Sequence, residues 1–366
     1  MTLPDLVCAD CGARYDVHSL VWRCECGGVL DTVTDAALHI TAQQSDRMSM
    51  WRYESVLPVP FDEKISLGEG WSPTVGSRTR PGIDYKLDFL MPTLSFKDRG
   101  AVVLATLAER LGVRSALTDS SGNAGTAAAA YFARAGIPCR VFVPEATSPG
   151  KLAQMRAHGA DVVTVAGSRA DAAAAARVAA SEPGVFYASH VFHPYFLHGV
   201  KTYGYEIWER GGRRLPDTVL VPIGNGTLAL GCHLAFTELV DAGLADGLPT
   251  LIGVQPEACA PVAQAFAAGL DTVAGVEPLP TSAEGIAIAA PPRGAAILAA
   301  VRATGGTVLT VTDDEVVAAR AELAAEGLYV EPTSAVCWAA ARRFPALGNP
   351  GHTVVPLCGA GLKAPR

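Results

Sequence analysis

The chain has 366 residues, of which 49% are hydrophobic and 18% charged, which is enough to bury the cores of two or three domains. A formal net charge of -7 without a long basic run argues against a nucleic-acid partner and against binding to an anionic membrane. The first residues lack the basic and apolar regions of a signal peptide, and no apolar run is continuous enough to span a bilayer.

Nine cysteines, four near the start and five scattered, are typical of a cytoplasmic protein rather than of a secreted disulfide framework. The first four form two close pairs, each followed by glycine, and this spacing predicts a zinc ribbon with the ligands Cys8, Cys11, Cys24 and Cys26. The second pair is C-x-C, one residue shorter than C-x-x-C, so unpaired cysteines in a tail are the alternative. Four sulfur ligands leave no open position, so a bound Zn²⁺ would be structural.

We expect Tyr15 and Trp22 to supply the hydrophobic cover of the ribbon, and a linker of little periodicity to occupy 31–50. A glycine-punctuated turn, Gly68-Glu69-Gly70, and two short strands then lead into the segment 92–100. From there apolar helices and short strands alternate to the C-terminus. This order predicts an α/β fold in which helices cover parallel sheets.

The later strands are expected at 115–118, 139–143, 161–165, 185–188, 218–222, 250–254, 308–311 and 353–357. The helices are expected at 101–111, 123–135, 151–158, 170–180, 199–210, 227–242, 261–268, 313–326 and 333–344.

Lys97 lies at the start of the first of these helices, just after a Pro-Thr turn. The positive end of a helix dipole and partial burial would both disfavour the charged form of a lysine there. A lysine that readily loses its proton can form an imine with an aldehyde. The position alone is weak evidence, because most lysines are solvated surface residues.

Two turns between a strand and a helix offer polar groups. Ser120-Ser121-Gly122-Asn123 presents hydroxyls, an amide and backbone N–H donors, which suits a carboxylate and a phenolic oxygen, although Ser and Asn are also ordinary helix caps. Gly224-Asn225-Gly226-Thr227 is either a phosphate cradle at a helix start or simply a tight turn. It lacks the G-x-G-x-x-G spacing and the lysine of a P-loop.

Cys358 follows the last expected strand, at the end of a parallel sheet where ligands bind, although a single buried cysteine is more often part of a core. Taken together, the chain offers a reactive lysine, a phosphate cradle and polar groups for a ring. A ligand with an aldehyde, a phosphate and polar ring atoms fits this set, and pyridoxal 5'-phosphate has all three.

Eight motifs recur in one group of enzymes: Gly68-Glu69-Gly70, the segment 92–100, Ser121-Gly122-Asn123, Gly199-Val200-Lys201-Thr202, Gly224-Asn225-Gly226, Ala283-Glu284-Gly285-Ile286, Glu331-Pro332-Thr333-Ser334-Ala335 and Gly359-Ala360-Gly361-Leu362-Lys363. From about Leu67 to the C-terminus the chain thereby resembles threonine synthases and, more broadly, the tryptophan-synthase-like (fold type II) pyridoxal-phosphate enzymes. The N-terminal ribbon resembles one found in many threonine synthases.

The resemblance implies two parallel-sheet domains after a ribbon and linker at 1–45. A large cofactor-binding domain would comprise 46–100 and 200–366, and a small domain 101–199. It implies that Lys97 carries the cofactor imine and that Asn123 contacts the ring hydroxyl. It further implies that Gly224, Asn225, Gly226 and Thr227 hold the phosphate and that Cys358 faces the ring nitrogen, where threonine or serine is usual. Relatives are commonly dimers, so a homodimer is expected by analogy.

The substrate would be a small amino acid. Threonine synthases hold the phosphate of O-phospho-L-homoserine with hydroxyl, amide and arginine side chains, at positions that correspond here to Ala124, His190, Val191, Phe196 and Leu228. Only His190 is polar, and each charge-assisted hydrogen bond lost by a dianion costs about 1.5–3 kcal/mol.

We therefore expect substrate contacts from Ser120, Ser121, Gly122, Ala124, His190 and Phe196. Specificity would be set in the loop 189–198, where His190, His193 and His198 either take part in specificity or proton transfer or are surface and capping residues.

The implied activity is that of a lyase in which Lys97 removes the α-proton of an L-amino acid and a side-chain group then leaves. The nearest reaction converts O-phospho-L-homoserine and water to L-threonine and phosphate. The alternative is a serine or threonine dehydratase or a β-replacement synthase, because the expected phosphate contacts are missing. A catalytically silent regulator or a zinc-ribbon binding module is a third possibility, which the intact segment 92–100 opposes.

Overall fold

The structure is a computed structural model that describes residues 3–32, 46–344 and 351–363. Its contacts divide the chain into two units: unit 1 comprises Met1–Gly70 and Lys97–Val200, and unit 2 comprises Trp71–Phe96 and Lys201–Arg366. Most of the expected linker at 31–50 lies outside the described residues, and the domain bounds implied by the resemblance stay a prediction. No described helix is long and apolar enough to cross a membrane.

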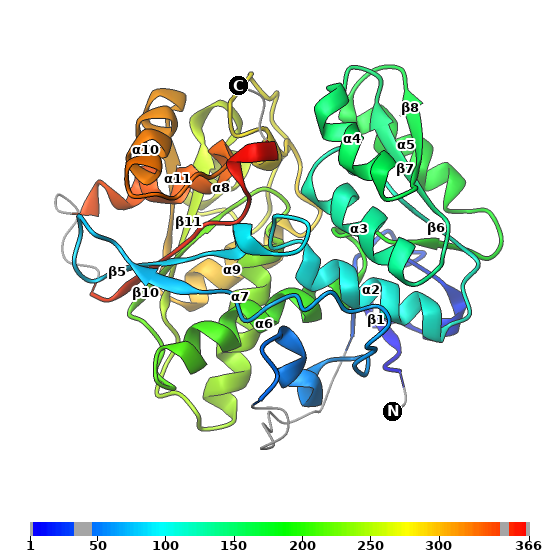
Figure 1. Cartoon of the computed structure of the whole chain (residues 1–366), viewed down its shortest axis with the longest axis horizontal. Coiled ribbons are helices and arrows are strands. Elements are labelled where there is room, and N and C mark those ends of the chain that lie inside the picture. Colours follow the sequence, from blue (N-terminus) through cyan, green and yellow to red (C-terminus); the bar gives the residue numbers. More distant parts are fainter. Residues whose placement is uncertain (1–2, 33–45, 345–350, 364–366) are drawn as a thin grey trace. The chain divides into compact units, whose positions relative to one another are not determined.

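Unit 1 holds the N-terminal ribbon and a four-stranded parallel sheet of strand order β8-β7-β6-β9 (Figure 1). The ribbon is an antiparallel sheet of order β2-β1-β3, with β1 (Leu6–Cys8), β2 (Arg14–Tyr15) and β3 (Leu30–Thr32). The larger sheet has β6 (Ser115–Thr118), β7 (Cys139–Pro144), β8 (Asp161–Val165) and β9 (Val185–Tyr187). The helices of this unit are α2 (Asp98–Arg110), α3 (Asn123–Arg134), α4 (Pro149–Ala157) and α5 (Arg169–Ala179).

Unit 2 is built on a six-stranded sheet of order β12-β11-β10-β13-β5-β4, in which only the edge strand β4 runs antiparallel to its neighbour. Its strands are β4 (Thr74–Gly76), β5 (Ile83–Lys86), β10 (Thr218–Pro222), β11 (Thr250–Pro256), β12 (Thr307–Val311) and β13 (Thr353–Pro356). Its helices are α7 (Thr227–Asp241), α8 (Pro261–Ala267), α9 (Gly294–Ala303), α10 (Asp313–Ala325) and α11 (Pro332–Ala341), and α6 (Pro194–Arg210) begins in unit 1 and ends in unit 2.

The core of unit 2 lies between its sheet and α11. Trp338 of this helix is buried and packs edge-on against Tyr85 of β5, with ring centroids 5.3 Å apart. Because side chains alternate along a strand, Leu220 of β10 joins this cluster while its neighbours Val219 and Val221 are buried on the opposite face. Strands buried on both faces are typical of parallel sheets covered by helices, as the sequence predicts.

The expected element order is confirmed, although several helix bounds differ: α4 begins at Pro149 rather than at 151, and α11 ends at Ala341 rather than at 344. The first helix begins at Asp98 rather than at 101, so that Lys97 is its N-cap residue. Helix α6 begins at Pro194 rather than at 199, because proline is well suited to the first helical position, and the loop expected at 189–198 is therefore shorter. Helix α9 is not among the expected elements, although its alanine-rich sequence favours a helix.

Candidate active site

Lys97 is placed by the start of α2. Its backbone lies in the helical region as the N-cap residue, and its carbonyl oxygen accepts the Ala101 N–H at 3.0 Å. The side chain is half-buried, and its Nζ lies 5.6 Å from the centroid of the Phe196 ring. The amino group is thus held beside an aromatic face.

Phe196 reaches Lys97 because α2 and α6 cross closely. A Cβ atom on Gly100 would lie 2.4 Å from the Phe196 ring, and one on Gly199 would lie 2.0 Å from the carbonyl oxygen of Arg99. Both glycines are therefore required by this contact between the helices. The motif Gly199-Val200-Lys201-Thr202 has its first residue at the crossing, which explains its glycine in packing terms.

His190 is the polar group next to this pair. Its ring lies 6.0 Å from that of Phe196, its side chain is only 8% exposed, and its Nδ1 has no hydrogen-bond partner among the described residues. Burial, and then the charges of Lys97 and Arg169, hold the pKa of His190 well below its usual range. His190 is thus a neutral imidazole with one unused nitrogen close to Lys97.

The idea that the three histidines of 189–198 lie on the surface is wrong. His193 and His198 are each 5% exposed, and the His193 ring packs 5.2 Å from Phe186 and 5.4 Å from Tyr195. His193 is therefore part of an aromatic cluster.

The turn Ser120-Ser121-Gly122-Asn123 follows β6 and opens α3. Asn123 is the first residue of the helix, Gly122 is its N-cap, and the Gly122 N–H donates to Ser120 Oγ at 3.3 Å. A Cβ on Gly125 would meet the Ser120 carbonyl oxygen at 1.8 Å, so the turn folds tightly onto its own helix. Ala124 is buried behind it. A helix N-terminus in this position attracts anionic oxygens.

Two charged residues near this turn were missed by the sequence reasoning. Arg169, the first residue of α5, acts electrostatically on both His190 and Asp119. Burial raises the pKa of Asp119, which follows β6, against the opposing effects of Tyr187 and Arg169. The only signal available in the sequence was that both residues follow strands of a parallel sheet, whose carboxyl ends share one edge.

In unit 2, the turn Gly224-Asn225-Gly226-Thr227 joins β10 to the 15-residue helix α7. Gly226 is the N-cap, with a φ of +75° that favours glycine, and a Cβ there would collide with Ile297. A Cβ on Gly224 would lie 2.9 Å from Ile286 Cα. Both positions require glycine, and the turn leaves backbone N–H groups at a helix start.

Cys358 is 2% exposed and lies two residues after β13. Its carbonyl oxygen accepts the N–H of Phe96 at 2.9 Å, and Phe96 immediately precedes Lys97 in the chain. The neighbouring Gly359 N–H donates to Ser334 Oγ at 2.8 Å, which connects this turn to α11. The structure thus places the predicted residues in two units. Unit 1 holds Lys97, with Phe196 and His190 near it, and the turn 120–124, and unit 2 holds the residues at the carboxyl ends of its strands.

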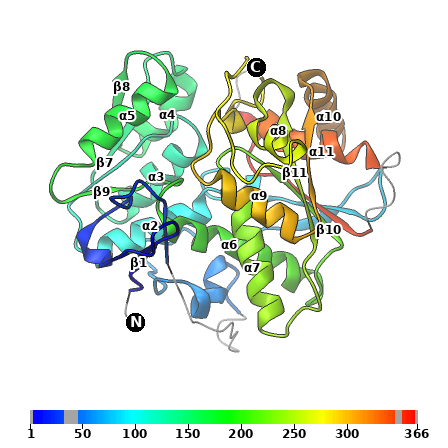
Figure 2. The same ribbon diagram turned by 180° about the vertical axis from the view of Figure 1, so that it is seen from behind.

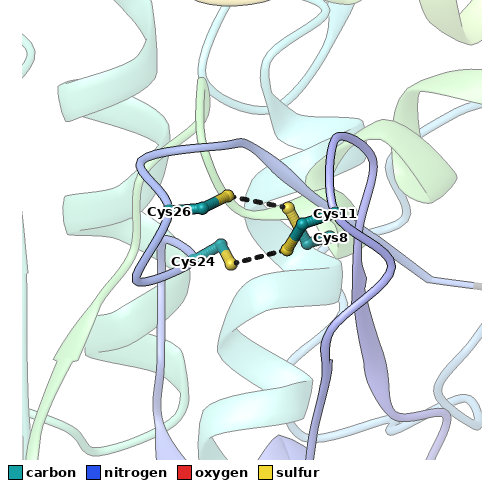
Figure 3. A group of neighbouring side chains, drawn as sticks. All are labelled: Cys8, Cys11, Cys24 and Cys26. Atoms are coloured by element: carbon teal, nitrogen blue, oxygen red, sulfur yellow. Dashed lines mark hydrogen bonds between the residues drawn. The ribbon is translucent and has the colours of Figure 1, made fainter.

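The four N-terminal cysteines converge (Figure 3). Their sulfur atoms all lie within 4.8 Å of one another, with 3.6 Å between Cys8 and Cys26 and 3.5 Å between Cys11 and Cys24. Four thiolates around Zn²⁺ at 2.3 Å would be about 3.8 Å apart, so this donor set fits a tetrahedral zinc ion. The shortened C-x-C pair therefore still brings both of its sulfurs to the cluster.

The ribbon's residues explain this convergence. A Cβ on Gly28 would lie 2.7 Å from Cys8 Sγ, so glycine is needed beside the sulfur. The Tyr15 hydroxyl lies 3.1 Å from Cys24 Sγ and lowers the pKa of that thiol to about 6, which makes a thiolate ligand available at neutral pH. Trp22, expected to cover the ribbon, packs on Tyr187 and Phe192 of unit 1.

The family of the chain follows from comparison with known proteins. Residues 65–359 match the family described as "Pyridoxal-phosphate dependent enzyme", and this match includes Lys97, both polar turns and Cys358. The chain belongs to this family of pyridoxal-phosphate-dependent enzymes.

Among individual proteins, threonine synthases are similar over nearly the whole chain. The threonine synthase of Methanosarcina acetivorans is 34% identical, with 96% of this chain and 90% of the relative covered. That of Methanocaldococcus jannaschii is 35% identical, with 98% and 92% covered. Among solved structures, the crystal structure of a threonine deaminase has a TM-score of 0.67 at 28% identity, covering 79% of this chain and 92% of that one.

Proposed function

We propose that the protein is a threonine synthase-like lyase that removes the α-proton of an L-amino acid and then eliminates or replaces a side-chain group. The nearest reaction is the conversion of O-phospho-L-homoserine and water to L-threonine and phosphate. The observation that carries this proposal is the identity of 34–35% to threonine synthases over at least 96% of the chain. The Lys97 segment is intact within this match.

The residues present fit pyridoxal phosphate. The two glycines of the 224–227 turn cannot carry a Cβ, and the turn lies at the start of a long helix, as a phosphate site requires. We assign Gly224, Asn225, Gly226 and Thr227 to the phosphate, Cys358 to the ring nitrogen and Asn123 to the ring hydroxyl. When bound, the cofactor supplies an electron sink for the charge left at Cα after proton removal.

Lys97 would hold the cofactor covalently and, once displaced by the substrate amine, take the proton from Cα. The Phe196 ring, 5.6 Å from Nζ, would restrict where the amino group can move. The N–H groups at the start of α3, with Ser120, Ser121 and Gly122, would hold the substrate carboxylate. Ala124, His190 and Phe196 would then face the substrate side chain.

Two observations favour different leaving groups. The buried side chains of Val191 and Phe196 offer no charge-assisted hydrogen bond to a phosphate, which favours elimination or replacement on a serine- or threonine-like substrate. The charge of Arg169 reaches His190, which favours an anionic group instead. We keep dehydration or β-replacement as the second candidate function.

A turnover screen tests the proposal. The cofactor-loaded protein is offered O-phospho-L-homoserine, L-serine, L-threonine and their O-acyl and O-phospho derivatives, and phosphate, threonine and keto acid are measured. We expect turnover of at least one of these with kcat/KM of about 10⁴ per molar per second. Threonine and phosphate as products would establish the nearest reaction, and keto acid the alternative. No turnover of any of them would contradict the proposal.

We further propose that Cys8, Cys11, Cys24 and Cys26 bind one structural Zn²⁺. The protein purified without chelator should contain about one zinc per chain, and Cys26→Ser should lower that content. His18→Asn, an exposed ribbon residue that is not a ligand, is the matched control. Zinc-free wild-type protein would contradict the assignment.

The place of action and the assembly are also proposals. None of the nine cysteines, all of which the structure describes, forms a disulfide, which supports a reducing compartment and thus the cytoplasm. A homodimer is proposed by analogy with relatives, and sedimentation of the cofactor-loaded protein tests it.

A further inference from the structure

The ribbon is docked on the sheet of unit 1 rather than attached only through the chain. The Trp22 ring meets Tyr187 edge-on at 5.1 Å between centroids, and Phe192 at 5.2 Å. Tyr187 ends β9, beside which the dark blue ribbon lies in Figure 2. Aromatic pairs in this geometry contribute stability beyond the area that they bury.

Further contacts reach the same part of the chain. The Arg23 guanidinium lies 5.8 Å from the centroid of the Phe192 ring. The Tyr195 hydroxyl donates to the carbonyl oxygen of Pro4 at 2.7 Å, and the Tyr195 side chain is fully buried. The ribbon therefore contacts the segment 187–195 at two places, through Pro4 before the first cysteine pair and through Trp22 and Arg23 before the second.

This segment has a second side that faces the candidate active site. Phe192 and Tyr195 contact the ribbon, whereas His190 and Phe196, from the same turn and the first turn of α6, lie near Lys97. The turn between them is held by Ser189.

Three hydrogen bonds to backbone N–H groups make this turn rigid. Ser189 Oγ accepts the N–H groups of Val191 and Phe192 at 3.3 and 3.2 Å, and the Ser189 carbonyl oxygen accepts that of His193 at 3.1 Å. A displacement of Phe192 would therefore move His190 with it.

The side chains that dock on the segment 187–195, Trp22 and Arg23, lie next to the cysteine cluster in the chain. Trp22 and Arg23 directly precede Cys24. Arg23 Nε donates a hydrogen bond across the turn 24–27 to the Gly27 carbonyl oxygen at 2.6 Å. A metal ion that joins Cys24 to Cys8 would fix Trp22 relative to Pro4. In small metal-binding units the metal supplies much of the folding free energy. The segment 22–27, which carries Trp22, should therefore become less ordered when the metal is removed.

We propose that the metal-bound ribbon is a positioning element for the substrate side of the candidate site, with Trp22 as the positioning residue. It acts through Phe192 and the Ser189 turn to hold His190 and Phe196 against Lys97. The inference rests on the proposed function only in assigning His190 and Phe196 to the substrate. The docking geometry is independent of that assignment.

Hydrogen–deuterium exchange of the full-length, cofactor-loaded protein tests the proposal without any substrate. We expect the amides of Val191, Phe192 and His193 to exchange roughly tenfold faster in Trp22→Ala and in wild-type protein stripped of zinc by a chelator. Trp22→Phe, which keeps a ring, should restore slow exchange. Helix α10 of unit 2 is the internal control and should not change. Unchanged exchange at 191–193 in either the variant or the stripped protein would overturn the proposal.

Kinetics with a substrate found in the screen supply the second readout. Trp22→Ala should lower kcat/KM about tenfold, as expected when contacts far from the chemistry are displaced, while the borohydride-reducible cofactor at Lys97 and its absorbance stay unchanged. Trp22→Phe should recover most of the activity. Equal loss of cofactor and activity would point to general unfolding and overturn a positioning role. A wild-type protein inactive on every substrate would contradict the proposed function, and the exchange result would still decide the docking.

Discussion

At the scale of single residues, Lys97 is positioned by its backbone at the start of α2 and by the Phe196 ring beside its amino group. The Lys97 carbonyl oxygen accepts the Ala101 N–H of α2, and the side chain is half-buried. Lys97→Ala should therefore abolish the borohydride-reducible bond to the cofactor and lower turnover by at least about a thousandfold, because the lysine is a reactant. Absorbance of the cofactor and mass spectrometry after reduction measure this.

The control is Lys64→Ala, which removes an exposed lysine of the same unit and should leave the reducible adduct intact. If Lys97→Ala keeps the same adduct, another lysine carries the cofactor. Far-ultraviolet circular dichroism should be the same for both variants and the wild type.

His190 is expected to make stability depend on pH. Its pKa is lowered on folding, mainly by burial, so the folded state binds fewer protons than the unfolded state below the ordinary pKa of about 6.5. Stability is thus lost as the pH falls below about 6.5, by up to about 1.4 kcal/mol per pH unit from this group.

The substitution His190→Asn should flatten the loss of stability between pH 6.5 and 5, measured by urea unfolding at several pH values. His18→Asn, which removes an exposed imidazole of the same unit, should leave the slope as in the wild type. An unchanged slope in His190→Asn would show that other groups dominate in this range.

The residues of the candidate site differ in how well the sequence predicted them. Lys97 and the glycines of 224–227 stood out because their signals are local: a strand, a small polar turn and a helix start. Arg169 and Asp119 did not, because the effects of Arg169 on His190 and on Asp119 depend on how strands β6 to β9 pair, which no local pattern specifies. The partners of Trp22 were missed for the same reason, since they are about 170 residues away in the sequence.

At the scale of elements, the crossing of α2 and α6 depends on two glycines. Gly199→Ala would place a Cβ 2.0 Å from the Arg99 carbonyl oxygen, which belongs to the backbone and cannot rotate away. We expect a loss of about 1–3 kcal/mol in stability and a displaced Phe196. Thermal unfolding and the near-ultraviolet spectrum measure the two effects.

Gly150→Ala in α4 is the matched control, because nothing lies within 4 Å of the Cβ it would add. Alanine favours a helix over glycine by roughly 1 kcal/mol, so this variant should be slightly stabilised. A Gly199→Ala protein as stable as the wild type would show that the helices can separate at little cost.

The boundaries of the elements were predicted less well than their order. Proline at position 194 permitted two interpretations, a loop residue or the first residue of a helix, and the contact of α6 with α2 selects the second. The alternating strands and helices carried enough signal to give both parallel sheets, because strands buried on two faces are continuously apolar.

At the scale of the whole molecule, unit 2 contains a buried ion pair that joins distant parts of the chain. Lys86 Nζ lies 2.7 Å from Glu206 Oε2, both side chains are inaccessible to water, and Glu206 also accepts the N–H groups of Trp71 and Ser72. Lys86→Met would leave the carboxylate of Glu206 buried without its cation. We expect this to cost about 3–5 kcal/mol in stability, measured as the urea midpoint of the unit 2 transition.

Breaking an exposed pair is the control. Arg302→Ala removes the partner of Asp271, whose side chain is 94% exposed, and should cost less than about 1 kcal/mol. An equal loss of stability in Lys86→Met and Arg302→Ala would mean that water reaches Lys86. Retention of wild-type stability by Lys86→Met would contradict the assignment of an essential ion pair.

The strand order of unit 2 has a consequence for synthesis of the chain. Strand β13, the last in the sequence, lies between β10 and β5, and its partner Ile83 precedes Thr353 by 270 residues. On the ribosome, β4 and β5 must therefore wait for the final strand, whereas the sheet of unit 1, from Ser115 to Tyr187, can close much earlier. The Lys97 segment would be completed only after Cys358, whose carbonyl oxygen accepts the Phe96 N–H, has been translated. The apolar strands of unit 2 would need protection by chaperones during that interval.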